Sequence, residues 1–264
     1  MLKCDLVHGR YAVFSKLLSF FLFCATEFMS VKVLIIIPCF NEEQSLPGLL
    51  ANLKDCITQS AFTVIPVVVN DCSRDGSETV ARSFGVNVLN LPNNLGIGGA
   101  VQTGIKYALS KGFDYCIQMD GDGQHPPAEF EKLVNNAIKT GADVVIGSRF
   151  LTGEGFQSTF IRRLGIKYFH FLNRILTGKS IHDITSGYRL LGEKAMKLAA
   201  NYYPDDYPEP ESLVFFSKHG LKIVEVPVTM HHRQGGKSSI GTFASVYYWV
   251  KVTAAMFYSY IRKQ

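Results

Sequence analysis

The feature that most constrains the fold is a regular alternation of apolar runs and helical patterns between residues 31 and 146. The apolar runs are continuous, which is typical of parallel strands buried on both faces. Between the runs, apolar residues recur at helical spacing, as Leu46, Leu49 and Leu53 do. This alternation predicts an α/β fold, a mainly parallel sheet with helices on both faces. The predicted strands are Val31–Ile37, Phe62–Val69, Val86–Leu91, Phe113–Met119 and Ala142–Ile146.

Polar clusters follow four of these predicted strands. They are Pro38–Glu42, Asp71, Asn94–Gly99 and Asp120–Gln124. Ligands of open parallel sheets bind outside the carboxyl ends of the strands. We therefore expect the four clusters to line one binding site.

The pair Asp120 and Asp122 points to a metal. On a strand, residues two apart project to the same side, and two carboxylates that close repel each other unless a cation joins them. Oxygen ligands suit magnesium or manganese, and Gly121 lets a bulky ligand approach the backbone. The pattern predicts a metal site that holds a diphosphate. The alternative is a polar turn after a core strand.

The glycines from Gly96 to Gly99 do not complete a dinucleotide fingerprint, because Val101 stands where its last glycine belongs. They still place backbone N–H groups near the start of a predicted helix, Gly98–Lys111, and such groups suit phosphate. Gly98 is therefore a candidate for donor binding.

Composition narrows the class of protein further. Hydrophobic residues make up 47% of the chain and charged residues 19%, which indicates a globular protein. The net charge of +5 fits an anionic ligand or a membrane surface and gives no argument for nucleic acid. The six cysteines form no CxxC pair, which favours reduced thiols over a disulfide framework or a zinc site.

Three segments are expected from these patterns. Residues 1–30 differ from the rest and are interpreted as an N-terminal extension, with Met29 as an alternative start. Residues 31–240 form the predicted catalytic domain, and residues 241–264 a C-terminal amphipathic helix. Phe160–Leu176 and Phe243–Ile261 mix aromatic side chains with lysine or arginine, as helices that lie on a membrane do. The alternative is that these aromatic residues pack on the sheet or across a dimer, in a homo-oligomer.

Six motifs occur in a fixed order along the chain. They are Pro38-Cys39-Phe40-Asn41-Glu42, Asp71-Cys72-Ser73-Arg74-Asp75-Gly76-Ser77, Asn94-Leu95-Gly96, Asp120-Gly121-Asp122-Gly123-Gln124-His125-Pro126, Gly147-Ser148-Arg149 and Ser186-Gly187-Tyr188-Arg189. With this ordered set the chain resembles family 2 glycosyltransferases of the Rossmann-like GT-A fold, close to the dolichyl- or polyprenyl-phosphate sugar transferases. The resemblance implies a nucleotide-sugar donor, Mg²⁺ or Mn²⁺, and inversion at the anomeric carbon.

The same resemblance implies roles for individual residues. Asp71 would hold the base or the ribose of the nucleotide. Arg149 and a loop from Arg233 to Lys237 would face the diphosphate or an acceptor phosphate. The nucleoside pocket would be lined by Pro38, Phe40 and Glu42, and the metal would be held by Asp120, Asp122 and Gln124.

The nucleophile is left open by the sequence. A sugar hydroxyl needs a general base, whereas a lipid phosphate is already anionic. Asp183 is the first candidate for a base, and Glu209 and Glu211, in a predicted rigid acidic turn from Tyr207 to Glu211, are the second.

We expect a metal-dependent inverting glycosyltransferase, peripheral to the cytoplasmic face of the membrane. It would move sugar to a lipid-linked acceptor, either a polyprenyl phosphate or a lipid-linked glycan, in cell-wall or surface polysaccharide synthesis. The alternatives are a non-catalytic partner that binds nucleotide sugar and a phosphatase that uses DxD. That alternative is a phosphatase of the haloacid-dehalogenase type, a family that has Thr or Val where this chain has Gln124.

Overall fold

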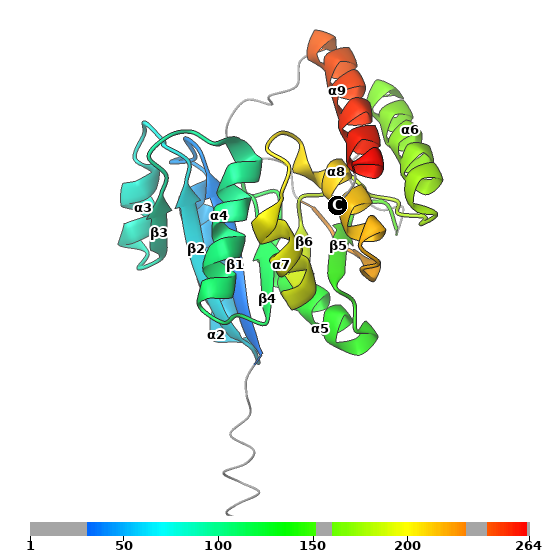
Figure 1. Cartoon of the computed structure of the whole chain (residues 1–264). Coiled ribbons are helices and arrows are strands. Elements are labelled where there is room, and N and C mark those ends of the chain that lie inside the picture. The colour runs from blue at the N-terminus through cyan, green and yellow to red at the C-terminus, as the bar shows by residue number, and fades with distance from the viewer. Residues whose placement is uncertain (1–30, 152–159, 231–241, 263–264) are drawn as a thin grey trace, which may run out of the picture. The chain divides into compact units, whose positions relative to one another are not determined.

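The computed structural model describes residues 31–151, 160–230 and 242–262, and these form one seven-stranded sheet with helices around it (Figure 1). The strand order is β3-β2-β1-β4-β6-β5-β7. All five strands named in the sequence analysis are present, so the prediction of an α/β fold is confirmed. The strands are β1 Lys32–Cys39, β2 Thr63–Asn70, β3 Asn87–Asn90, β4 Tyr115–Gln118, β5 Val144–Ser148, β6 Arg189–Gly192 and β7 Ile223–Pro227.

β1 lies at the centre of the parallel half of the sheet. It pairs in parallel with β2 on one side and with β4 on the other. Every residue of β1 after Lys32 is buried, although successive side chains point to opposite faces of a strand. Both faces of β1 are therefore covered, as its continuous apolar sequence predicts.

β6 is a strand that the sequence analysis does not predict. It is only four residues long, and it runs antiparallel to both β4 and β5, with Leu190 paired with Ile117 and with Val145. Four residues are too few to show the two-residue alternation of buried and exposed side chains that identifies a strand. Its insertion brings the segment from Ser186 to Arg189 beside the end of β4, where the paired aspartates begin.

The helices pack on the sheet and on one another. Close approach of α4 to β1 depends on Gly104, because a Cβ there would lie 2.4 Å from Cγ2 of Ile36. The helical elements are α2 Leu46–Thr58, α3 Ser77–Ser83, α4 Gly96–Ser110, the short 3₁₀ element η1 Pro127–Glu129, α5 Phe130–Thr140, α6 Phe160–Thr177, α7 Glu193–Asn201, α8 Pro208–Lys218 and α9 Thr242–Ile261.

The expected rigid turn from Tyr207 to Glu211 is wrong, because this segment begins a helix. Pro208 occupies the first turn of α8, where a missing N–H group costs nothing. Tyr207, the residue before the helix, has a left-handed backbone with a φ of 48°. Glu209 and Glu211 both fall in the first turn of α8, where acidic residues interact favourably with the helix dipole.

α6 and α9 lie side by side (Figure 1). The rings of Tyr168 and Trp249 stack with centroids 5.9 Å apart, and the Tyr168 hydroxyl lies 3.0 Å from Oγ1 of Thr253. A C-terminal helix is therefore confirmed. Within the described part of the chain, no helix has the length and apolar character needed to cross a membrane.

Candidate active site

The loops that follow β1 and β4 meet at the carboxyl edge of the sheet. The Ser45 hydroxyl, one residue before α2, lies 2.9 Å from the carbonyl oxygen of Gly121. A Cβ on Gly121 would lie 3.2 Å from the carbonyl oxygen of Pro38 and 3.5 Å from Cγ of Glu42. The structure thus brings Pro38, Glu42 and Gly121 together, as the polar clusters predict.

The loop after β1 is fixed by the loop after β2. Asn41 has a φ of 58°, its N–H group donates to Oγ of Ser73, and its Oδ1 accepts from the N–H group of Arg74. The N–H group of Glu42 donates to Oγ of Ser77 at 2.9 Å. Phe40 is 47% exposed at this rim. An exposed ring held on a fixed loop is able to stack on a planar base.

Asp71, the residue after β2, binds backbone N–H groups at the start of helix α4. Its Oδ1 accepts from the N–H group of Leu95 at 2.7 Å, and its Oδ2 accepts from the N–H group of Gly96 at 2.9 Å. The carboxylate is buried. Each oxygen of a carboxylate has a second lone pair, so the capping role leaves acceptor capacity. The expected contact of Asp71 with a base or ribose stays a prediction.

Gly98 has a structural partner in place of the expected phosphate. Its N–H group donates to the carbonyl oxygen of Asp205 at 3.1 Å. A Cβ on Gly98 would lie 1.9 Å from the carbonyl oxygen of Pro204. This geometry argues against Gly98 as a donor-binding residue, because its N–H group is already used and the segment 204–205 lies against it.

Asp120 and Asp122 lie in a turn beyond β4, which ends at Gln118. Strand periodicity therefore does not set their directions, contrary to the expectation. Local hydrogen bonds do so instead. Oδ1 of Asp120 accepts from Nε2 of Gln118 at 3.0 Å, and Oδ1 of Asp122 accepts from the N–H group of Gln124 at 3.0 Å. Asp122 is buried and Asp120 is half-buried.

His125 supports this turn, and the sequence analysis gave it no role of its own. Its Nδ1 accepts from the N–H group of Asp120 at 2.9 Å, so in the neutral ring the proton lies on Nε2. The ring is buried and stacks on Tyr188, with centroids 4.9 Å apart and an interplanar angle of 12°. The sequence signal for this contact is the spacing alone, because His125 follows Asp120 by five residues in one short loop.

Arg149 and Asp183 form a buried ion pair. Nε and Nη2 of Arg149 each lie 2.7 Å from a different oxygen of Asp183, whose Oδ2 also accepts from the N–H group of Arg149. Asp183 is fully buried. Although burial alone would lower it, the pKa of Arg149 is raised by the carboxylate. A base must reach the substrate proton, so this arrangement argues against Asp183 as the base.

Glu209 lies close enough to the aspartate turn for the charge of Asp120 to affect its pKa. Burial raises the pKa of the Glu209 carboxyl, nearby Asp120 raises it further, and Arg189 opposes both. Arg189 is buried and holds this first turn of α8 in place. Its guanidinium donates to the carbonyl oxygens of Ile184, Ser186 and Glu209 and to Oγ of Ser212.

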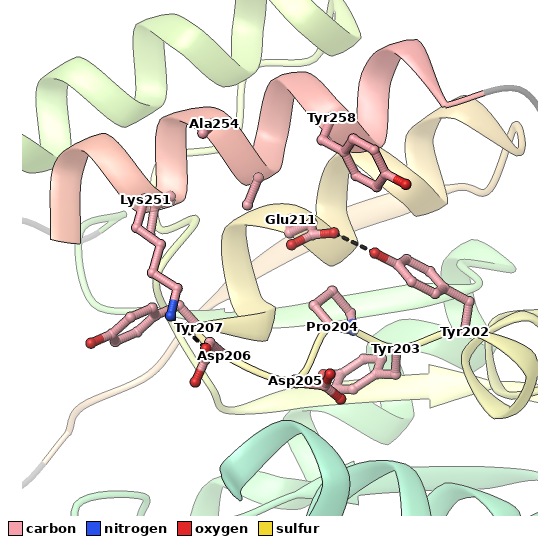
Figure 2. Close-up of a pocket in the computed structure, with 12 residues that line it drawn as sticks. Tyr202, Tyr203, Pro204, Asp205, Asp206, Tyr207, Glu211, Lys251, Ala254 and Tyr258 are labelled. Atoms are coloured by element: carbon pink, nitrogen blue, oxygen red, sulfur yellow. Dashed lines mark hydrogen bonds and ion pairs between the residues drawn. The ribbon is translucent and has the colours of Figure 1, made fainter. Parts of the chain in front are cut away.

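Glu211 faces a different space from Glu209. Residues two apart on a helix do not share a face. The Glu211 carboxylate accepts from the Tyr202 hydroxyl at 2.6 Å and lines a cavity between the segment 202–207 and α9 (Figure 2). Arg233 and Lys237 lie outside the described residues.

The residues at the aspartate turn fit a metal in their chemistry. Asp120 and Asp122 offer carboxylate oxygens, which suit Mg²⁺ and Mn²⁺. Gly187 keeps the turn open, because a Cβ there would lie 3.3 Å from Oδ2 of Asp120. Among the described residues, no group of three or more His, Cys, Asp or Glu side chains is placed to hold a metal. Magnesium is commonly bound by one or two carboxylates together with substrate phosphates. Gln124 as a third ligand stays a prediction.

Comparisons with known proteins agree with this geometry. A family model described as glycosyl transferase family 2 matches residues 34–198. The chain is 34% identical over 216 residues to an undecaprenyl-phosphate mannosyltransferase of Micrococcus luteus, and the alignment covers 80% of this chain and 88% of that protein. It is 31% identical over 226 residues to a polyprenol monophosphomannose synthase of Mycolicibacterium smegmatis, covering 82% and 83%.

A solved structure shows the same fold. It is glucosyl-3-phosphoglycerate synthase from Mycobacterium tuberculosis, in complex with Mn²⁺, UDP-glucose and phosphoglyceric acid. The TM-score is 0.67 at 16% identity, and the match covers 88% of this chain and 81% of that chain. At this identity the likeness establishes the fold, which is the expected GT-A fold.

Proposed function

Because this chain belongs to glycosyl transferase family 2, we propose that it moves a sugar from a nucleotide-sugar donor to a polyprenyl phosphate. Two relatives that align over more than 80% of their length are named for undecaprenyl-phosphate and polyprenol monophosphomannose chemistry. The family match leaves the phosphatase alternative without support.

The observation that carries the proposal is the meeting of the β1 and β4 loops around Gly121, beside Asp120 and Asp122. Pro38, Glu42 and Gly121 come together there, and an exposed Phe40 ring stands on the same rim. A bound Mg²⁺ or Mn²⁺ would stabilise the negative charge that develops on the leaving nucleoside diphosphate. Asp120 and Asp122 would hold that ion.

The neighbours of Asp120 would preorganise it. Gln118 holds its Oδ1, and His125 holds its backbone N–H group. A group that is already oriented before the substrate arrives loses little conformational entropy when it binds. These contacts would keep the carboxylate aimed at the diphosphate while Phe40 stacks on the base.

A polyprenyl phosphate acceptor fits the ion pair of Arg149 and Asp183. An anionic phosphate needs no general base, so a fully buried Asp183 is no obstacle. Asp183 would instead hold Arg149, whose guanidinium also donates to Oγ1 of Thr185 at 2.9 Å.

A second candidate function is favoured by Glu209. Burial and the charge of Asp120 raise its pKa although Arg189 opposes them, and a raised pKa is the direction that suits a carboxylate general base. In this version the acceptor is the hydroxyl of a lipid-linked glycan, and Glu209 accepts its proton. Products made from the two acceptors separate the two versions.

Membrane association is proposed from the exposed faces of α6 and α9. On α6, Phe171 and Ile175 are each 62% exposed, beside the exposed cations Lys167 and Arg174. On α9, exposed fractions are 63% for Tyr247, 65% for Val250 and 67% for Ile261. Apolar and basic side chains on neighbouring helices bind anionic lipid surfaces. We propose a peripheral enzyme at the cytoplasmic face, and a homo-oligomer stays an alternative for this surface.

The test is a donor screen by thermal stabilisation, with magnesium or manganese, followed by transfer assays. The wild type and the exposed control Asp55→Asn should be stabilised by one sugar nucleotide, and Asp122→Ala should not. That donor should then label undecaprenyl phosphate. Stabilisation by no nucleotide sugar would refute the proposal. Binding of a sugar nucleotide without its hydrolysis or transfer would support the alternative, a non-catalytic partner that binds nucleotide sugar.

A further inference from the structure

A cavity of about 420 Å³ lies between the segment 202–207, the first turn of α8 and α9 (Figure 2). Its volume falls in the range of small-molecule sites, roughly 300–1,000 Å³. The segment 204–205 separates it from the N-terminus of α4, through the contact of Gly98 with Pro204 and Asp205. No role proposed for the donor or the acceptor uses this cavity.

The lining is acidic and aromatic. Asp205, Asp206 and Glu211 supply three carboxylates, and Lys251 supplies the one ammonium group among the described lining residues. Figure 2 shows Lys251 directed at Asp206, with which it forms an ion pair. Arg262 also lies close enough to Glu211 for its positive charge to act on that carboxylate. The three carboxylates still outnumber these two cations, which disfavours a phosphate or another anion.

A cationic ligand is disfavoured at two of the four lining tyrosines, because the chain places its own cations over the rings of Tyr207 and Tyr202. Nζ of Lys251 lies 5.8 Å from the centroid of the Tyr207 ring, and the Arg262 guanidinium lies 4.3 Å from the centroid of the Tyr202 ring. Cations at such distances occupy the electron-rich faces that an ammonium ligand would need.

A hydrocarbon chain would have to cover carboxylates. Glu211 is only 7% exposed, and within the described residues its carboxylate has one hydrogen-bond partner, the Tyr202 hydroxyl. Covering it with hydrocarbon would remove the water that hydrates its second oxygen, and such desolvation of a charge is costly. The occupant must therefore bring hydrogen-bond donors.

We propose that this cavity binds an uncharged saccharide. Sugar hydroxyls are donors that match carboxylate oxygens, which only accept. The apolar face of a sugar ring packs on an aromatic ring, and Tyr258 is 56% exposed at the cavity. The left-handed backbone of Tyr207, with a φ of 48°, places strain at the same wall, as is common at ligand sites.

The test is saturation-transfer NMR on the full chain, without nucleotide or metal. The probes are methyl α-glucoside, methyl α-mannoside and N-acetylglucosamine, with tetramethylammonium and inorganic pyrophosphate as charged comparisons. At least one sugar should receive saturation from the wild type, and the two charged probes should not. Glu211→Gln should weaken binding of that sugar about tenfold, the usual loss for one hydrogen bond to a charged group.

Two tryptophan variants on α9 localise the binding. Ala254→Trp fills the cavity from an exposed position and should abolish the sugar signal. Val250→Trp, also exposed but outside the lining, should keep it. Asp122→Ala should keep it too, which separates this cavity from the transfer site. Failure of every sugar to bind, equal signals from the two tryptophan variants, or binding of a charged probe alone would overturn the proposal. Nucleotide-sugar binding in the thermal screen would be unaffected by that failure.

Discussion

Replacement of Asp183 by Asn should destabilise the protein through Arg149. Asp183 is fully buried, the Arg149 side chain is 16% exposed, and two hydrogen bonds of 2.7 Å join them. Asn cannot accept at both positions, and its amide group would face Nη2 of Arg149, donor against donor. A buried charge that loses its partner costs about 3–5 kcal/mol. Because Asn keeps the shape and one acceptor, we expect about 3 kcal/mol.

The assay is urea unfolding followed by circular dichroism. With a denaturant dependence of about 3 kcal/mol per molar, a loss of about 3 kcal/mol lowers the midpoint by about 1 M. The double variant Asp183→Asn, Arg149→Met should recover part of this loss, since it leaves no unpaired charge.

Two results would refute this reasoning. The first is a free energy of unfolding for Asp183→Asn within about 0.5 kcal/mol of the wild type, the range usual for surface changes, together with loss of transfer and retained donor binding. That pattern would make Asp183 a base. The second is a double variant less stable than the sum of the two single changes predicts, which would mean that the ion pair is not the source of the effect.

Three further predictions concern His125, Gly98 and Glu211. His125→Ala should weaken metal-dependent donor binding about tenfold, because the N–H group of Asp120 loses its acceptor, and His125→Asn should recover part of it; equal affinities in calorimetry would contradict this. Gly98→Ala should lower stability by about 1–3 kcal/mol through its clash with Pro204, and an unchanged melting temperature would show that the segment yields freely. Burial raises the pKa of Glu211 above its ordinary value of 4.5, so its stabilising contribution is complete below that value and is lost as pH rises through the higher folded pKa. The melting temperature of the wild type should therefore fall relative to Glu211→Gln as pH rises above about 4.5, and parallel curves would contradict the shift.

Part of the site was readable from the sequence because it depends on local patterns. The polar clusters follow strands, and strand ends of a parallel sheet share an edge. That reasoning correctly grouped Pro38, Glu42 and Gly121. It failed where a side chain is used by a distant part of the chain. Gly98 and Asp205 are joined by a hydrogen bond across more than a hundred residues of sequence, and no local pattern predicts such a contact.

The acidic segment from Tyr207 to Glu211 shows a second kind of failure. Its prolines predict a turn, yet a proline at the first helical position with acidic residues beside it is also typical of the start of a helix. Once the segment is helical, Glu209 and Glu211 point to different sides. One lies near Asp120 and the other in a separate cavity.

The sequence by itself determined the alternating strands and helices, the family and the aspartate pair, because periodicity and motif order are carried by neighbouring residues. Only the tertiary structure decided which carboxylates are already paired with other groups of the chain. Asp183 is paired with Arg149 and Asp71 caps α4, while Glu209 stays near the aspartate turn. The reason is that burial and ion pairing depend on which distant segments the sheet brings together, and the four-residue strand β6, too short to read, joins two of them.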